Sequence, residues 1–172
     1  FVISWLLNNQ ISGDNTKRLL QITSARAKRL HPAFGTDPKR LTSLVTDGGS
    51  ENDCKVVKSY LDDSPLCLVI AQQHVDFPNI LIECFFRSLK NNFLYLQNIT
   101  SKKELIEKLK FYIRQYNNLI PHGAFKGATP REIYMDRWSS SDEKKLEENG
   151  QSAADRRREK NKSQTCSNCW NV

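Results

Sequence analysis

The first 71 residues alternate short apolar runs, rich in β-branched and aromatic side chains, with longer polar segments. The apolar runs predict strands over residues 1–7, 41–45 and 66–71, because each is short and is followed by turn-forming residues or by a predicted helix. The segments between them predict helices over residues 14–30 and from about 50 to 61. This order predicts an α/β fold in which helices cover a parallel or mixed sheet.

The second half of the chain predicts helices with one apolar face each. Apolar side chains recur at spacings of three and four over residues 78–96 and again from residue 101 to the proline at 121. A last short helix is predicted over residues 129–135. Polar residues at the predicted helix starts fit N-caps. They are Asp14 or Asn15, Ser50 or Asn52, Ser101 with Glu104, and Thr129 with Glu132.

The composition changes after residue 135, where large apolar side chains become rare and charged ones dense. We therefore predict two parts, a core over residues 1–135 and a charged tail over residues 136–172 that is disordered or loosely helical. Within the tail, the basic run over residues 156–162 is flanked by acids, which favours a solvated segment over a phosphate contact.

Several classes of protein are excluded by composition. No apolar run approaches the roughly 18 residues that cross a bilayer, so we do not expect a membrane-spanning protein. Five cysteines are an odd number and are scattered, which argues against a disulfide framework. Residues 1–7 lack the features of a secretory leader, so a cytoplasmic location is expected. Because the sequence begins with Phe1 and its one methionine is Met135, we expect a piece of a longer protein.

The positive charge is localised. The chain has a formal net charge of +7, and residues 84–135 alone hold nine Lys and Arg against three Glu, a net charge of +6. A local basic excess favours a polyanionic partner such as nucleic acid, whereas the commoner alternative is a set of solvated lysine-rich helices.

Two acidic residues stand where a ligand site is expected. Asp47 follows a predicted strand directly and precedes two glycines, and Glu83 lies in the first turns of a predicted helix. Helical spacing places Glu83, Arg87 and Lys90 on one side of that helix. The simpler alternative is a solvated helix face with an ion pair between Glu83 and Arg87.

Three motifs resemble the catalytic core of the DDE recombinases, which are insertion-sequence transposases and retroviral-type integrases. Exactly 35 residues separate Asp47 from Glu83, as in many members of that family. The motifs are Thr46-Asp47-Gly48-Gly49-Ser50, then Asn79-x-x-x-Glu83 continuing to Lys90, and Tyr116-Asn117 followed by Pro121-His122 and Gly127-Ala128-Thr129-Pro130. The resemblance covers about residues 1–135.

The resemblance implies a ribonuclease-H-like mixed sheet flanked by helices and an enzyme of DNA transposition or integration. It implies that Asp47 and Glu83 are catalytic ligands of Mg²⁺ or Mn²⁺, which prefer carboxylate oxygen. It implies that Lys90, assisted by Arg87, contacts DNA. The partners would be element ends and target DNA, bound by a homo-oligomer in the nucleoid of a bacterial or archaeal cell.

Two positions depart from the family pattern. No residue matches the first catalytic Asp, and the resemblance places the first two strands of the sheet before Phe1, so we expect this chain to be inactive. Ile120 stands where the family has Arg. The alternatives are a ribonuclease-H-like nuclease and a non-catalytic DNA-binding relic of a transposase.

Five further residues are weaker candidates. His122 is interpreted as a loop residue at a helix end, and His74 and Asp76 as loop residues of the connection before the Glu83 helix rather than metal ligands. Cys166 and Cys169 form half of a zinc site, for which no second pair of ligands is present in the sequence.

Overall fold

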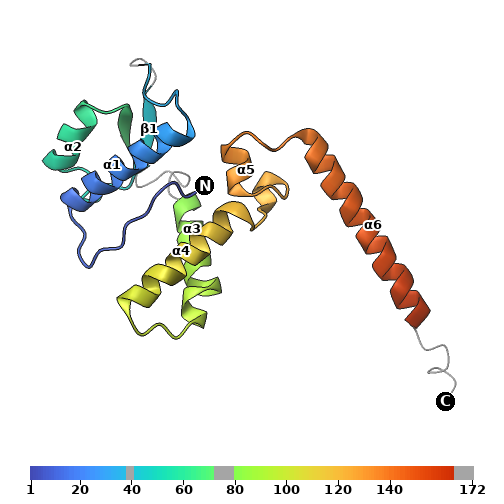
Figure 1. Ribbon diagram of the computed structural model, residues 1–172. Coiled ribbons are helices and arrows are strands. Elements are labelled where there is room, and N and C mark those ends of the chain that lie inside the picture. The colour runs from blue at the N-terminus through green and yellow to red at the C-terminus, as the bar shows by residue number, and fades with distance from the viewer. Residues whose placement is uncertain (38–40, 72–79, 165–172) are drawn as a thin grey trace. The chain divides into compact units, whose positions relative to one another are not determined.

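The computed structural model describes residues 1–37, 41–71 and 80–164 (Figure 1). The chain divides into two compact units, which are described separately. One comprises residues 2–113, and the other comprises Phe1 with residues 114–172.

The first unit begins with a β-α-β arrangement beside a long helix (Figure 1). Strands β1 (Thr42–Thr46) and β2 (Leu66–Ile70) are parallel, and helix α2 (Lys55–Asp62) connects them. Helix α1 (Gly13–Leu30) packs on α2. The core of this α1-β-α-β part is formed by three buried side chains, which are Leu20 of α1, Val57 of α2 and Leu66 of β2.

Close packing of α1 on α2 depends on a glycine. A Cβ atom added at Gly13 would collide with Sγ of Cys54, the N-cap residue of α2. Farther along, the hydroxyl of Tyr60 hydrogen-bonds Oγ of Ser24 at 3.3 Å. The two helices therefore contact each other at both ends of α2.

The predicted strand over residues 1–7 is wrong. Residues 1–8 have no regular secondary structure, and the sheet of the described residues has two strands only. The segment binds α1 instead, since the guanidinium of Arg26 donates to the carbonyl of Ile3 at 3.1 Å and Ser4 hydrogen-bonds Thr23. An apolar run becomes a strand only when a second strand pairs with its backbone, and neither β1 nor β2 does so here.

The predicted starts of α1 and α2 are corrected by one or more residues. Ser12 caps α1 in place of Asp14 or Asn15, and its hydroxyl accepts from the backbone N–H of Asn15 at 3.4 Å. Helix α2 starts at Lys55, because the backbone N–H groups of Asn52 and Asp53 turn back to the carbonyl of Gly49.

The predicted helix over residues 78–96 is divided in two. Helix α3 (Ile80–Asn92) ends at Phe93, whose φ of −139° is not helical, and a short 3₁₀ turn, η1 (Leu94–Leu96), follows. Phe93 packs between α3 and α4 (Lys102–Asn118), with its ring 5.1 Å from that of Tyr112. The ring of Phe85 lies 6.2 Å from that of Tyr112, so aromatic contacts join the two helices.

The start of α4 forms the predicted capping box in part. The hydroxyl of Ser101 accepts from the backbone N–H of Glu104 at 3.2 Å. The Glu104 carboxylate returns to the backbone N–H of Thr100, at 3.1 Å, and not to that of Ser101. The N-cap is thus as predicted, and the reciprocal bond lies one residue earlier.

The second unit contains the end of α4, the 3₁₀ turn η2 (Gly123–Phe125) and helices α5 (Pro130–Tyr134) and α6 (Ser140–Gln164). The capping box predicted for α5 is confirmed, because Thr129 and Glu132 exchange both bonds. The tail, expected to be disordered or loosely helical, forms helix α6 over 25 residues, none of them buried. The division of domains at residue 135 stays a prediction.

Within the described residues, no helix combines the length and the apolar character that crossing a membrane requires.

Candidate metal and nucleic-acid site

Asp47 is the first residue after β1, and the loop that follows fixes its side chain. Oδ1 of Asp47 accepts a hydrogen bond from the side-chain amide of Asn52 at 2.8 Å and a longer one from the backbone N–H of Gly49 at 3.4 Å. The residue is exposed. One carboxylate oxygen is therefore engaged by the loop, while Oδ2 has no hydrogen-bond partner within the described part of the chain.

Asn52 is predicted from the sequence only as a candidate helix cap, and its contact with Asp47 is not predicted. It lies in the turn that precedes the start of α2 at Lys55, and this turn brings its side-chain amide to Asp47. The nearby Asp53 is engaged elsewhere, because its carboxylate forms an ion pair with Lys58 at 2.7 Å. The only hint in the sequence is that Asp47 and Asn52 are two polar residues five positions apart. Such pairs are too common to predict a contact.

Glu83 occupies the first turn of α3, where the positive end of the helix dipole favours a carboxylate. Its side chain is exposed. The ion pair between Glu83 and Arg87 that the simpler alternative expects is not present among the described residues. The carboxylate is therefore accessible on the outer side of the helix.

Arg87 and Lys90 lie on the same side of α3 as Glu83, and both are exposed. Arg87 also lines a shallow groove of about 220 Å³, together with Cys84, Ser88, Asn91 and Asn92. The other side of α3 is packed, since Phe85 and Leu89 are buried. Ser88 hydrogen-bonds the hydroxyl of Tyr112 on α4 at 2.9 Å, which holds the polar side of α3 outward.

The donor chemistry of the two acids fits a hard divalent cation, but their arrangement does not complete a ligand set. Within the described residues, Oδ2 of Asp47 and the carboxylate of Glu83 have no hydrogen-bond or ion-pair partner, and carboxylate oxygen is the ligand type that such cations prefer. Among the described residues, no three His, Cys, Asp or Glu side chains gather into a group that fits a metal ion. The residues over 72–79, which include His74 and Asp76, lie outside the described residues, as do Cys166 and Cys169.

The third motif builds a closed loop in the second unit. His122 hydrogen-bonds the carbonyl of Ala128 through its backbone N–H at 3.0 Å, and its carbonyl accepts from Gly127 at 3.0 Å. Its ring packs edge-on against Tyr116, with 4.8 Å between the ring centres. Burial lowers the pKa of the His122 imidazole below its ordinary value.

The C-terminal part of this loop is anchored by burial and by an ion pair. Ala128 and Pro130 are fully buried, and an ion pair of 2.6 Å joins Lys126 to Glu143 of α6. The bond to Glu143 raises the pKa of Lys126. The described contacts of this motif are thus those of a structural element, in agreement with the loop interpretation of His122.

Comparisons with known proteins bear on the same motifs. Residues 73–130 match the family described as integrase core domain. Two curated relatives are similar, both uncharacterized proteins of insertion element IS136, one from Agrobacterium fabrum strain C58 and one from Agrobacterium tumefaciens strain T37. Each is 24% identical over 137 residues, which cover 77% of this chain and 66% of the relative. No solved structure matches the chain.

Proposed function

We propose that this chain, which carries part of a transposase/integrase core, serves in DNA transposition as a transposase of the DDE type. One observation carries the proposal. The segment that matches the integrase core, residues 73–130, contains Glu83, Arg87 and Lys90 together with the loop around His122. Asp47 precedes it at the end of a strand, 35 residues before Glu83.

In this proposal Asp47 and Glu83 are two ligands of Mg²⁺ or Mn²⁺. Their exposed carboxylates are of the type that these hard cations prefer. When bound, such cations activate an attacking oxygen and stabilise a leaving one in phosphoryl transfer. The role of Asn52 is to hold Oδ1 of Asp47, so that Oδ2 stays available.

Arg87 and Lys90 are proposed to contact the phosphates of an element end. Both side chains are exposed cations beside Glu83, on the side of α3 that faces away from the apolar core. A phosphate contact requires only reach and positive charge. The local charge of +6 over residues 84–135 supports a polyanion as the partner.

The proposal also includes a ribonuclease-H-like fold and a homo-oligomeric assembly. The parallel pair β1 and β2 with its connecting helix is compatible with a ribonuclease-H-like sheet. No residue of this chain matches the first acidic ligand of the family, so we expect the chain by itself to bind DNA without cutting or joining it. We further propose that the protein acts as a homo-oligomer on paired DNA ends.

The test is DNA binding by the full chain, measured by fluorescence anisotropy with a labelled duplex over a series of salt concentrations. Arg87→Gln combined with Lys90→Gln is expected to weaken binding and to reduce the slope of log K against log salt by about 2. The matched control is Lys28→Gln with Arg29→Gln, which removes two exposed charges from the end of α1.

The control is expected to leave the slope near that of the wild type. An equal loss of affinity in both variants, or none in either, contradicts the proposed contact. DNA cleavage in Mg²⁺ that Asp47→Asn abolishes, without strand-transfer products, would instead favour a nuclease.

A further inference from the structure

Helix α6 has no described role in the core or in the site above. It contains 25 residues, none of them buried, and Leu146 is its only large apolar side chain. Leu146 lies against Gly127, where an added Cβ would collide with it. From Glu147 to Gln164 every side chain is therefore small, polar or charged.

Basic and acidic residues in the second half of α6 lie on different sides of the helix. At 3.6 residues per turn, Arg156 and Lys160 are one turn apart on the same side, and Arg157 borders it. Toward the start of the helix this side continues through the small uncharged Ser152 and Ala153. We call Arg156, Arg157 and Lys160 the α6 basic face.

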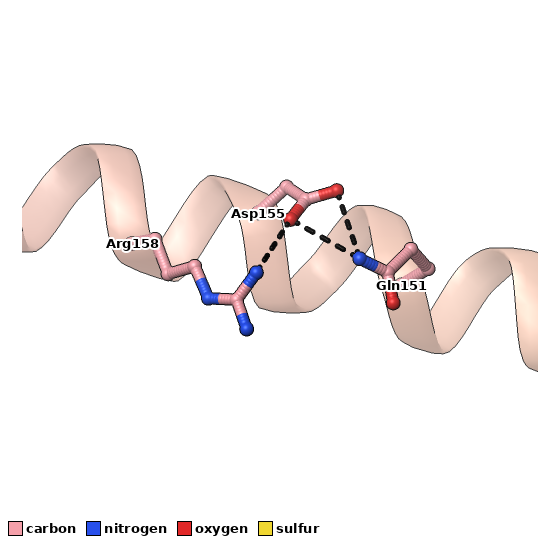
Figure 2. A network of polar contacts seen from close by, with 3 residues as sticks. All are labelled: Gln151, Asp155 and Arg158. Carbon is pink, nitrogen blue, oxygen red and sulfur yellow. Dashed lines mark hydrogen bonds and ion pairs between the residues drawn. The ribbon is translucent and has the colours of Figure 1, made fainter.

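The acids of this part of the helix lie on another side. Asp155 and Glu159 are also one turn apart, and Glu148 falls on the same line two turns earlier. This line lies about a third of a turn from the middle of the basic face, with Glu159 bordering Arg156. Figure 2 shows where Asp155 points: its carboxylate accepts from Gln151 at 3.3 and 3.4 Å and from Arg158 at 3.3 Å. Arg158 is thus the cation that neutralises Asp155.

The cations of the basic face remain uncompensated. Arg156, Arg157 and Lys160 are exposed, and within the described residues none of them forms an ion pair. Three positive charges within about a turn and a half of helix form a concentrated positive surface. Of the flanking acids, which suggested a solvated segment, Asp155 is held away from the basic face by Gln151 and Arg158.

We propose that the α6 basic face binds the phosphate backbone of duplex DNA, as a contact separate from Arg87 and Lys90. The small side chains of Ser152 and Ala153 allow the helix to approach the phosphates closely. Binding through charge alone is independent of sequence and strongly dependent on salt. This inference goes beyond the proposed function, because it requires neither Asp47 nor Glu83.

DNA is favoured over an anionic membrane by the absence of an apolar side. A helix that lies on a bilayer buries large apolar side chains opposite its cations. Residues 147–164 have none. The attraction that remains is electrostatic, and a duplex offers the denser line of negative charge.

The chain supplies a closely matched pair of variants. Arg156→Gln, Arg157→Gln and Lys160→Gln together neutralise the basic face. Lys144→Gln, Arg158→Gln and Lys162→Gln remove the same charge from the opposite side of the same helix. Because glutamine is a good helix former, both triple variants should retain the helix, which far-UV circular dichroism verifies.

The experiment is anisotropy with the full chain and a labelled duplex of arbitrary sequence. Loss of the basic face is expected to weaken binding about tenfold or more at low salt and to reduce the salt slope by about 2 to 3. The opposite-side variant should change the affinity much less. Arg156→Lys with Arg157→Lys, which keeps the charge, should bind as the wild type does.

Equal losses in the two triple variants would mean that only net charge matters, and would overturn the proposal. So would unchanged affinity in the basic-face variant. Binding to phosphatidylserine vesicles that depends on the basic face, with DNA binding unaffected, would assign the face to membranes instead. Because Arg87 and Lys90 are intact in both triple variants, failure here is separate from failure of the proposed function.

Discussion

The side-chain amide of Asn52 donates a hydrogen bond to Oδ1 of Asp47 across the loop that follows β1, at 2.8 Å. The bond is possible because Asn52 belongs to a turn closed on the carbonyl of Gly49 rather than to helix α2. It restricts the rotation of an otherwise exposed carboxylate. The proposed function makes Asp47 a metal ligand, and removing a group that orients such a ligand typically lowers metal affinity by about tenfold to a hundredfold.

If Asp47 binds the metal as proposed, Asn52→Ala should weaken Mn²⁺ binding to the chain by about tenfold or more. The reason is that Asp47 then samples rotamers that turn its free oxygen away. Titration of Mn²⁺ followed by electron paramagnetic resonance measures the change. The control is Asn92→Ala, which removes another exposed hydrogen bond from a side-chain amide, donated to Oγ of Ser88 at 3.4 Å. The same affinity in wild type and Asn52→Ala would show that the bond does not position the ligand.

A second prediction concerns the packed side of α3. Leu89 is 4% exposed and Leu81 is 83% exposed, although both belong to the same helix. Leu89→Ala should lower the free energy of unfolding by about 2 to 5 kcal/mol, because it leaves a cavity beneath the helix. Leu81→Ala should change it by less than about 0.5 kcal/mol. Urea denaturation distinguishes the two, and similar values would mean that the α3 core is not packed as described.

Packing partners explain which strands the sequence predicted well. The strands predicted over residues 41–45 and 66–71 agree with β1 and β2 to within one residue, because the two pair with each other. Residues 1–7 are also a short apolar run, yet the carbonyl of Ile3 is bound by Arg26 of α1. Apolar content alone does not reveal whether a pairing partner is within reach.

In the candidate site too, features that depend on local sequence were predicted, whereas a contact that depends on tertiary structure was not. The placement of Asp47 after a strand and of Glu83 in a first helical turn is confirmed, since both follow from local pattern. The resemblance to a transposase/integrase core is also confirmed, over residues 73–130. The bond from Asn52 depends on how a turn closes, which residue types do not specify. The roles of Asp47, Glu83, Arg87 and Lys90 stay predictions.

The third prediction compares two glycines of the second unit. Gly127 has a φ of +94°, and a Cβ there would meet Leu146, so Gly127→Ala should cost more than about 1 kcal/mol of stability. Gly150 lies inside α6 with open space around it. Gly150→Ala should instead stabilise the helix by up to about 1 kcal/mol. Far-UV circular dichroism during heating measures both, and a loss of helix in Gly150→Ala would contradict the exposed helix.

The last prediction is a dependence of stability on pH that arises from His122. Burial lowers the pKa of its imidazole in the folded chain, so the folded state favours the neutral form. The unfolded chain, with an ordinary histidine pKa of about 6.5, binds the proton first as the pH falls. The contribution of His122 to stability is therefore complete above that value, and it is lost as the pH falls from there through the lower pKa of the folded state.

His122→Gln should flatten this part of the curve of unfolding free energy against pH, since glutamine does not titrate. The measurement is urea denaturation at a series of pH values between about 4 and 8, with the ring of His122 followed by NMR in the wild type. His31→Gln removes an exposed histidine at the end of α1 and tests whether the loss of any imidazole has the same effect. If the two variants changed the curve equally, or if the NMR titration of His122 had a midpoint above 6.5, burial of this ring would not be the cause.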